Sequence, residues 1–216
     1  MSEKLEYALQ LAAQTARRVT FGPKAWASFL RTAARFYKYP FQDQLLIYAQ
    51  RPDATACASY DLWNRRMNRW IKQGSSGIAL VAETPKGLRL RYVFDVADTA
   101  GGKDAKAPYL WRLKPEHHAA LLESMTQDFL VSAKNLSELL QTAAASSVQN
   151  QYEDALPDLL KSREGSFLED LDDQNVRLLF RETLAASAQF ILLTRCGIDP
   201  EPFITQDDLR GIVNFN

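Results

Sequence analysis

Apolar residues recur at helical spacing along the first fifty residues, and the pattern predicts three helices. The first carries an apolar stripe of Leu5, Leu9, Ala12, Ala16 and Val19. The second runs from about Pro23 to Tyr37 and buries its tryptophan and phenylalanine. The third covers Phe41 to Gln50. It ends at Arg51-Pro52, because the residue before a proline is pushed out of the α region.

The stretch from Tyr60 to Thr99 changes its period part-way, which predicts a helix followed by a β-hairpin. The helix is expected from Tyr60 to Lys72, with Tyr60, Trp63, Met67, Trp70 and Ile71 as its apolar stripe. Gly74 and Gly77 then end it. The hairpin has strands Ile78–Glu83 and Leu88–Val96, joined by a turn that contains proline and glycine.

Alternation along the second hairpin strand predicts one apolar and one basic face. The apolar face, which we expect to be buried, holds Leu88, Leu90, Tyr92, Phe94 and Val96. Arg89 and Arg91 share the other face, which we expect to be exposed.

The second half of the chain reads as helical. Helices are expected at 116–125, at about 129–147 and at Val176–Cys196, with a short strand at 109–113 and a short capped helix from Thr205. Residues 99–108 form a glycine- and lysine-containing loop, which is the best domain boundary. The predicted fold class is α+β, mostly helical, with a small antiparallel β-sheet built around the hairpin and then a helical region. The predicted domains are 1–100 and 109–216.

The charge distribution separates the two halves. The 216 residues carry no formal net charge, and 46% of them are apolar, which suits a folded core. Residues 1–114 hold 19 Lys and Arg against 9 Asp and Glu, a net charge of +10, and the remainder balances it at −10. Such asymmetry points to nucleic-acid interaction. The acidic half has three readings: solvated helix faces, a dock for basic surface, or a mimic of DNA phosphates.

Localisation signals are few and favour a soluble cytoplasmic protein. Cys57 and Cys196 stand in no paired motif, which suits a reducing compartment. No apolar region follows the N-terminal residues, so no signal peptide is expected. The longest apolar run, at 184–193, is too short and too mixed to span a bilayer.

Catalytic patterns are absent from the sequence. His117 and His118 are adjacent and would point about 100° apart on a helix, so they do not converge on one metal. The chain has no HExxH, CxxC, Walker or GxSxG motif. Asp170, Asp172 and Asp173 are read as the cap of the helix that follows them. We therefore expect no enzyme activity, no metal and no cofactor.

Cations and aromatic residues interleave in the first half, as they do in proteins that hold single strands by phosphate contacts and base stacking. Trp26, Trp63 and Trp70 lie on apolar stripes and are read more readily as core residues. Tyr37, Tyr39 and Tyr48 lie near helix ends and are the more open candidates.

Several blocks resemble the N-terminal domain of ArdC-type antirestriction proteins, in the version found in large LtrC-like proteins of conjugative elements. The similarity covers roughly residues 5–100. It is carried by Phe41-Gln42-Asp43-Gln44-Leu45-Leu46-Ile47-Tyr48-Ala49-Gln50-Arg51-Pro52, Trp63, Arg69-x-Ile71-Lys72-x-Gly74-x-x-Gly77-Ile78 and Tyr92-x-Phe94-Asp95-Val96. The resemblance implies a single-stranded DNA-binding domain that acts in element transfer and protection from restriction. The implied DNA-facing residues are Gln42, Gln44, Tyr48, Trp63, Arg69, Lys72 and Gly74.

The chain departs from that family at two places. Ser75 and Ser76 stand where members commonly carry a charged pair. The helix Val176–Asp199 resembles the one that bears a zinc-binding glutamate in the ArdC protease-like domain, but 185–187 offer no carboxylate and HExxH is missing. The second half is therefore expected to be a metal-free relative without peptidase activity.

The sequence thus predicts a non-catalytic single-stranded DNA-binding module of a mobile-element protein, working beside other domains of a longer parent and with no membrane partner. Its predicted DNA-binding residues are Lys38, Tyr39, Gln42, Gln44, Tyr48, Trp63, Arg65, Arg66, Arg69, Lys72, Gly74, Arg89 and Arg91. The alternative is a protein–protein interaction module without DNA contact.

Overall fold

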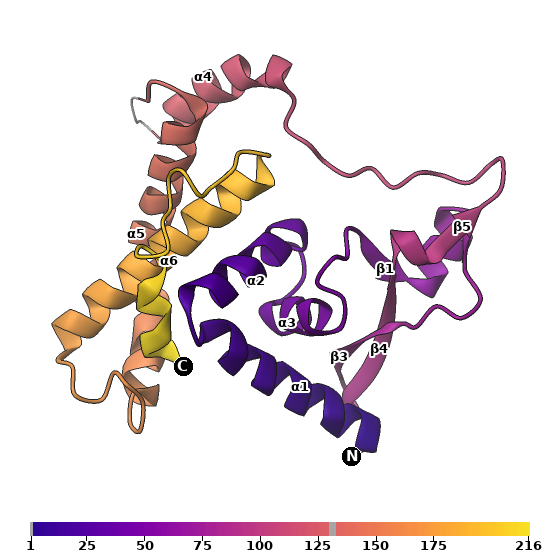
Figure 1. The fold of residues 1–216 in the computed structure, drawn as a ribbon, viewed down its shortest axis with the longest axis horizontal. Coiled ribbons are helices and arrows are strands. Elements are labelled where there is room, and N and C mark those ends of the chain that lie inside the picture. Colours follow the sequence, from indigo (N-terminus) through magenta and orange to yellow (C-terminus); the bar gives the residue numbers. More distant parts are fainter. Residues whose placement is uncertain (1, 130–132) are drawn as a thin grey trace. The chain divides into compact units, whose positions relative to one another are not determined.

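The computed structural model describes residues 2–129 and 133–216, and it confirms a mostly helical α+β chain with two small antiparallel sheets (Figure 1). The chain divides into two compact units. Unit 1 contains the residues up to Arg18 together with Arg35–Trp111. Unit 2 contains Val19–Ala34 together with Arg112–Asn216.

The second helix differs from the domain division expected from the sequence. Nearly all of α2 (Pro23–Arg35) belongs to unit 2, although the sequence places it within domain 1–100. Its Trp26 donates from Nε1 to Ser187 Oγ at 2.9 Å. Its Arg31 guanidinium lies 5.3 Å from the ring centroid of Phe190. These partners are about 160 residues away in the chain. A single domain boundary along the sequence therefore cannot put α2 in the same domain as its partners.

The core of unit 1 joins two of the predicted helices to the hairpin. α1 (Glu3–Thr20) and α3 (Phe41–Gln50) form where the apolar spacing places them. The central cluster of buried residues is Ala12, Phe36, Leu46, Ile47, Ala54, Ile78, Leu80 and Val93. Removing such side chains from water is the main driving force for folding this unit.

The hairpin is confirmed, and Arg89 and Arg91 are exposed as predicted, but the face of the second strand that meets the core is that of Val93 and not the predicted apolar face. Strands β3 (Ile78–Thr84) and β4 (Gly87–Asp95) pair antiparallel, and β1 (Cys57–Ser59) adds to β4, giving the order β1-β4-β3. Ile78 lies opposite Val93 in the register, and both are buried. Leu88 and Tyr92, which were expected inside, are 44% and 45% exposed.

The reversal has a physical cause on the neighbouring helix. Val93 shares its face with Arg91, and Arg91 forms an ion pair with the buried Asp43 of α3. A basic position can therefore lie on the core side of this strand, because its charge finds a partner there.

The predicted helix from Tyr60 to Lys72 is wrong beyond its first turn. A π-helical turn covers Leu62–Arg66, and Met67 N donates to Leu62 O at 3.1 Å. Asn68 then adopts φ 51°, a left-handed conformation that asparagine tolerates and that interrupts the helix. The chain continues as β2 (Arg69–Ile71), which pairs with β5 (Thr99–Gly101) in a two-stranded ribbon. Part of the expected flexible loop at 99–108 is therefore a strand.

Asp95 fixes the route from the main sheet to this ribbon. Its carboxylate is 2% exposed and accepts hydrogen bonds from the backbone N–H groups of Thr55, Ala56 and Ala97 at 2.7, 2.9 and 2.9 Å. A short 3₁₀ turn, Val96–Asp98, then leads into β5.

Asp95→Asn should lower the free energy of unfolding by about 1–2 kcal/mol, because an amide has one acceptor oxygen and turns its NH₂ group toward a backbone donor. Urea unfolding of the variant beside wild type measures the loss. Asp53→Asn, at an acid whose side chain is 82% exposed, is the matched control. Equal midpoints for all three proteins would contradict the role given to Asp95.

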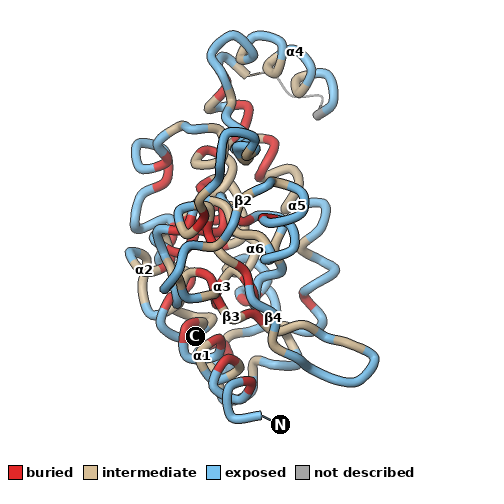
Figure 2. Tube along the Cα trace, turned by 90° about the vertical axis from the view of Figure 1, so that its right-hand side faces the viewer, coloured by how far each residue is buried: buried red, intermediate tan, exposed pale blue. Residues whose placement is uncertain are grey.

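Unit 2 is helical apart from its turns. Besides α2 it contains α4 (His118–Phe129), α5 (Leu136–Ser162) and α6 (Asp173–Arg195), with 3₁₀ turns at Pro115–His117 and Arg210–Phe215. The described side chains of α4 are all at least partly exposed, whereas α5 and α6 each contribute buried residues (Figure 2).

Several predictions for the second half are settled by these helices. The long helix at 176–196 is confirmed, and Asp172 caps it by accepting from Asn175 N at 2.9 Å. The expected helix at 129–147 falls partly on 130–132, which lie outside the described residues. Its expected end is wrong, since α5 continues to Ser162. Residues 109–113 form no strand. Thr205 and Asp208 make the reciprocal capping contacts, but only turns and the 3₁₀ segment follow.

No helix among the described residues combines the length and the apolar character needed to cross a bilayer.

Candidate nucleic-acid interface

The β2–β5 ribbon and the segments at its ends carry six cations and one exposed tryptophan. We call this surface the basic ribbon, and its residues are Arg65, Arg66, Arg69, Trp70, Lys72, Lys103 and Lys106. The π-helical turn supplies Arg65 and Arg66, and β2 supplies Arg69 and Trp70. Lys72 directly follows β2, and Lys103 and Lys106 follow β5. All of them belong to unit 1.

Trp70 is the aromatic platform of the basic ribbon. It lies opposite Ala100 in the register, and side chains alternate along a strand, so its ring stands on the face opposite Arg69 and Ile71. It is 49% exposed. An exposed indole beside cations can stack on a nucleobase while they contact phosphates.

Trp63 has the opposite environment, although the sequence made it a DNA-binding candidate. It is 2% exposed, and its Nε1 donates to the carbonyl oxygen of Phe94 at 2.8 Å. Its ring is therefore part of the core and has no face for a base to reach.

The cations of the basic ribbon differ in how far the protein already uses them. Arg65 makes an exposed ion pair with Asp61 at 3.4 Å, and such pairs contribute little. Arg69 is half-buried and donates from Nε to Thr99 Oγ1 at 2.7 Å. Lys72 donates from Nζ to the carbonyl oxygen of Ala97 at 2.8 Å, which leaves its charge uncompensated. Within the described ranges, no carboxylate lies in ion-pair distance of Arg66, Lys72, Lys103 or Lys106.

The turn after β5 places the last two lysines beside β2. Lys106 N donates to the carbonyl oxygen of Met67 at 2.8 Å, and Ala105 N donates to Gly102 O at 3.1 Å. Gly101 permits this turn, because a Cβ added there would lie 2.2 Å from the Cβ of Ala105. Gly74, at the other end of the ribbon, has φ +84° and ends the strand segment.

The second group of predicted residues, which lie after α2, on α3 and on β4, serves the structure of unit 1. The Arg91 guanidinium pairs with Asp43 and lies 5.8 Å from the ring centroid of Tyr39. The Tyr39 hydroxyl donates to Cys57 O at 2.7 Å. Gln44 donates from Nε2 to the carbonyl oxygens of Phe36 and Tyr39 at 3.2 and 2.8 Å, which satisfies the end of the preceding helix.

The remaining predicted residues lie apart from Trp70. Lys38 is exposed, with Nζ 5.7 Å from the ring centroid of Tyr37. Gln42 is exposed and Tyr48 is half-buried. Arg89 lies near the hairpin turn, and the seven residues of β4 from Arg89 to Asp95 span about 20 Å. Arg31, a further cation of the first half, lies in unit 2 and pairs with Glu201 at 2.7 Å.

Burial in this second group gives Tyr39 a pH signature. Burial, aided by the nearby Cys57, raises the pKa of Tyr39 to about 12 from its ordinary value near 10. Between those values the unfolded chain releases this proton and the folded chain keeps it. The free energy of unfolding should therefore fall as the pH rises from about 10 to about 12.

Tyr39→Phe should show a smaller fall in stability over that pH interval, although it starts lower by about 1 kcal/mol for the lost hydrogen bond to Cys57 O. Urea unfolding at pH 9 measures the stability lost with the hydrogen bond, and the difference between pH 9 and pH 11 measures the pH-dependent fall. Tyr37→Phe, at a tyrosine that is 51% exposed, is the control and should keep the wild-type pH dependence. A Tyr39→Phe protein with the full wild-type fall would contradict the assignment.

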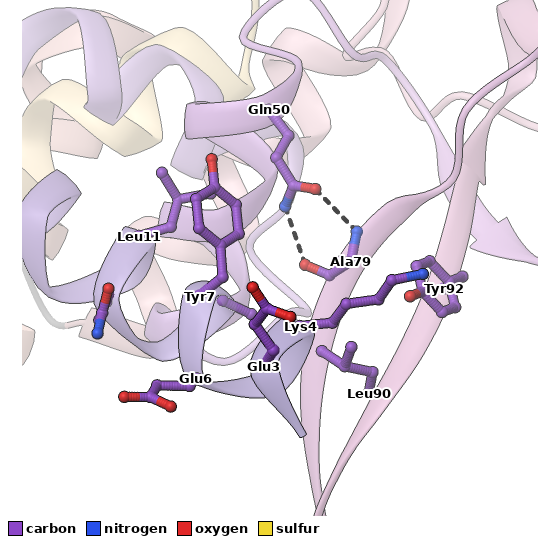
Figure 3. A pocket seen from close by; sticks show the side chains of 11 residues that line it. Glu3, Lys4, Glu6, Tyr7, Leu11, Gln50, Ala79, Leu90 and Tyr92 are labelled. Carbon is purple, nitrogen blue, oxygen red and sulfur yellow. Dashed lines mark hydrogen bonds between the residues drawn. The ribbon is translucent and has the colours of Figure 1, made fainter. Parts of the chain in front are cut away.

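A cavity of about 790 Å³ lies between α1 and the hairpin, away from the basic ribbon (Figure 3). Glu3, Glu6 and Tyr7 line it from α1, and Leu90 and Tyr92 from β4. The amide of Gln50 borders it and pairs with Ala79, donating to its O at 2.9 Å and accepting from its N at 2.9 Å (Figure 3). Glu3 and Glu6 outnumber the one cation of the lining, Lys4, so the charge of the cavity does not favour a phosphate chain.

Metal-site and thiol chemistry find little support in this chain. Over residues 2–129 and 133–216, no group of three or more His, Cys, Asp or Glu side chains is placed to hold a metal ion. Burial raises the pKa of Cys57 to about 12 and also raises that of Cys196, so both thiols keep their protons near neutral pH.

Comparison with models of known protein families, with curated proteins and with solved structures finds no match to this chain. The similarity to ArdC-type domains therefore stays a prediction that depends on the motif residues alone.

Three residues of the basic ribbon were missed as site residues: Trp70, Lys103 and Lys106. Trp70 was assigned to a helix stripe, and the lysines to a linker. The signal available was the order Asn68-Arg69-Trp70-Ile71, in which a turn former precedes residues that favour strands.

Proposed function

We propose that unit 1 is a non-catalytic, sequence-tolerant single-stranded DNA-binding module, and that the basic ribbon is its binding surface. The observation that carries the proposal is the exposed ring of Trp70 on a ribbon whose strand and flanking segments also carry six cations. A single strand needs both features, because its bases are unstacked and its phosphates are charged. The π-helical turn adds support, since such turns are frequent at functional sites.

The wider setting of the proposal comes from the resemblance to ArdC-type domains. It implies part of a larger protein of a mobile genetic element that acts in DNA transfer or antirestriction, and the unpaired cysteines suit the cytoplasm. Neither a cofactor nor a metal is required for this role.

Salt dependence tests the proposal. If Arg66, Lys72, Lys103 and Lys106 each neutralise one phosphate, affinity for a labelled dT20 should fall about 50-fold between 50 and 200 mM salt. Fluorescence anisotropy of the full chain measures it. The double variant Arg66→Ala, Lys72→Ala should bind more weakly and show a shallower slope.

The matched control for this test removes two charges from the hairpin turn, Lys86→Ala with Arg89→Ala. It should keep the wild-type affinity and slope, because the hairpin turn is at the opposite end of β4 from Asp95, where the chain leaves the sheet toward β5. Equal losses in both double variants would mean that binding follows net charge and not this surface.

A protein–protein interaction module is the second candidate, and the ion pairs of the chain favour it. Cations of the first half already have carboxylate partners in Arg31 with Glu201, Arg51 with Asp98, and Arg91 with Asp43. In this alternative the remaining cations bind acidic surface on a neighbouring domain of a longer protein. A flat dT20 titration at 50 mM salt favours it.

A further inference from the structure

The segment that follows the basic ribbon exposes a second aromatic group. Residues 105–114 form neither helix nor strand (Figure 1), and we call 102–111 the strap. Within it Tyr109 is 85% exposed, Leu110 42% and Trp111 38%. Three large apolar side chains in succession on the surface mark an interaction site more often than scattered exposed residues do.

The charges of the strap indicate which partner it suits. Lys103 and Lys106 precede the aromatic group, and Arg112 and Lys114 follow it directly in the sequence, against the single acid Asp104. Cations that flank a group of rings match a polyanion that carries flat apolar groups, which describes a single nucleic-acid strand. A purely apolar partner would gain nothing from the flanking cations, and these would resist burial.

The backbone of the strap starts at the basic ribbon and is already restricted. The hydrogen bond from Lys106 N to Met67 O fixes its first part to the end of the π-helical turn. Pro108 has a fixed φ and holds Ala107 in extended conformations. The strap therefore loses less conformational entropy when it binds a ligand. The six residues from Lys106 to Trp111 can span about 17 Å when extended.

We infer that the strap is a second subsite for the same strand, so that one single-stranded DNA molecule runs from Trp70 along the strap and stacks on Tyr109 and Trp111. The inference rests on the proposed function of the basic ribbon. It extends the surface from one stacking platform to three and predicts a dependence on oligonucleotide length.

Length-dependent binding tests the inference. Anisotropy titrations use the full chain with labelled dT6 and dT20 at 50 mM salt. Tyr109→Ala should weaken dT20 binding about fivefold or more and leave dT6 binding at the wild-type value, because the short strand is held by the ribbon. Tyr109→Phe keeps a ring and should restore dT20 binding. Phe167→Ala, at a ring that is 73% exposed in unit 2, is the matched control.

The outcomes separate the inference from the proposed function. If wild type binds neither oligonucleotide, the proposed function fails and the inference with it. If wild type binds dT20 and Trp70→Ala weakens it, while Tyr109→Ala matches wild type, only the inference is overturned. An equal loss on dT6 and dT20 also overturns it, as does a Tyr109→Ala protein that binds dT20 normally but no longer self-associates in sedimentation.

Discussion

Replacing Trp63 with alanine should lower the free energy of unfolding by about 3–5 kcal/mol, the usual cost of removing a buried tryptophan. The ring is 2% exposed, and its removal leaves a cavity in unit 1. It also leaves the carbonyl oxygen of Phe94 without the donor that now lies 2.8 Å away. Urea unfolding followed by far-ultraviolet circular dichroism measures the loss.

Trp63→Phe separates the two contributions. It keeps most of the apolar volume and loses the Nε1 donor, so its cost should be smaller, about 1–2 kcal/mol. A Trp63→Ala protein that unfolds at the wild-type urea concentration but no longer binds dT20 would restore Trp63 as a stacking residue and contradict its place in the core.

Replacing Trp70 with alanine should leave the stability of the fold almost unchanged and weaken DNA binding, in contrast to replacing Trp63. The ring is 49% exposed, so the stability of the fold should change by no more than about 0.5 kcal/mol. Loss of one stacked base should weaken single-stranded DNA binding by about 1–3 kcal/mol, or about 5- to 150-fold in Kd. Anisotropy titration with labelled dT20 measures the effect.

Tyr7→Ala is the matched control for Trp70→Ala. Tyr7 is 66% exposed in the same unit, but it lines the cavity that also contains Glu3 and Glu6. The Tyr7→Ala protein should bind dT20 with the wild-type affinity. Trp70→Phe should fall between wild type and Trp70→Ala, because a smaller ring still stacks. If Trp70→Ala binds as tightly as Tyr7→Ala, the basic ribbon is not the platform.

Local patterns in the sequence were sufficient for the elements that depend on local contacts. The spacing of apolar residues gave α1, α3 and α6, and the turn chemistry around Pro85 gave the hairpin. The cap at Asp172 was also predicted, since a side chain that binds a backbone N–H three residues on depends on neighbours alone.

The ribbon could not be predicted in this way because its pairing is distant in sequence. Trp70 fits a helix stripe by spacing, and only its pairing with Ala100, thirty residues on, makes it a strand residue. The same applies to the face of β4. Whether Arg91 points to the core depends on Asp43, which lies 48 residues earlier in the chain.

The sequence predicted the kinds of residue in the candidate site better than it predicted which of them lie together. Arg65, Arg66, Arg69 and Lys72 remain together on the basic ribbon. Tyr39, Gln44 and Arg91 instead serve the packing of unit 1, because their polar groups are taken by Cys57, by the end of α2 and by Asp43. A sequence shows which side chains suit a ligand, but internal partners decide which of them stay available.

Photo-cross-linking tests the central claim most directly, because it reports where a strand lies. The full chain is irradiated with a dT20 that carries 5-bromodeoxyuridine, and the cross-linked peptides are identified by mass spectrometry. The predicted product joins the oligonucleotide to Trp70 and disappears in Trp70→Ala. Cross-links confined to unit 2 or to the cavity beside Tyr7, with none on residues 65–72, would contradict the assignment of the basic ribbon.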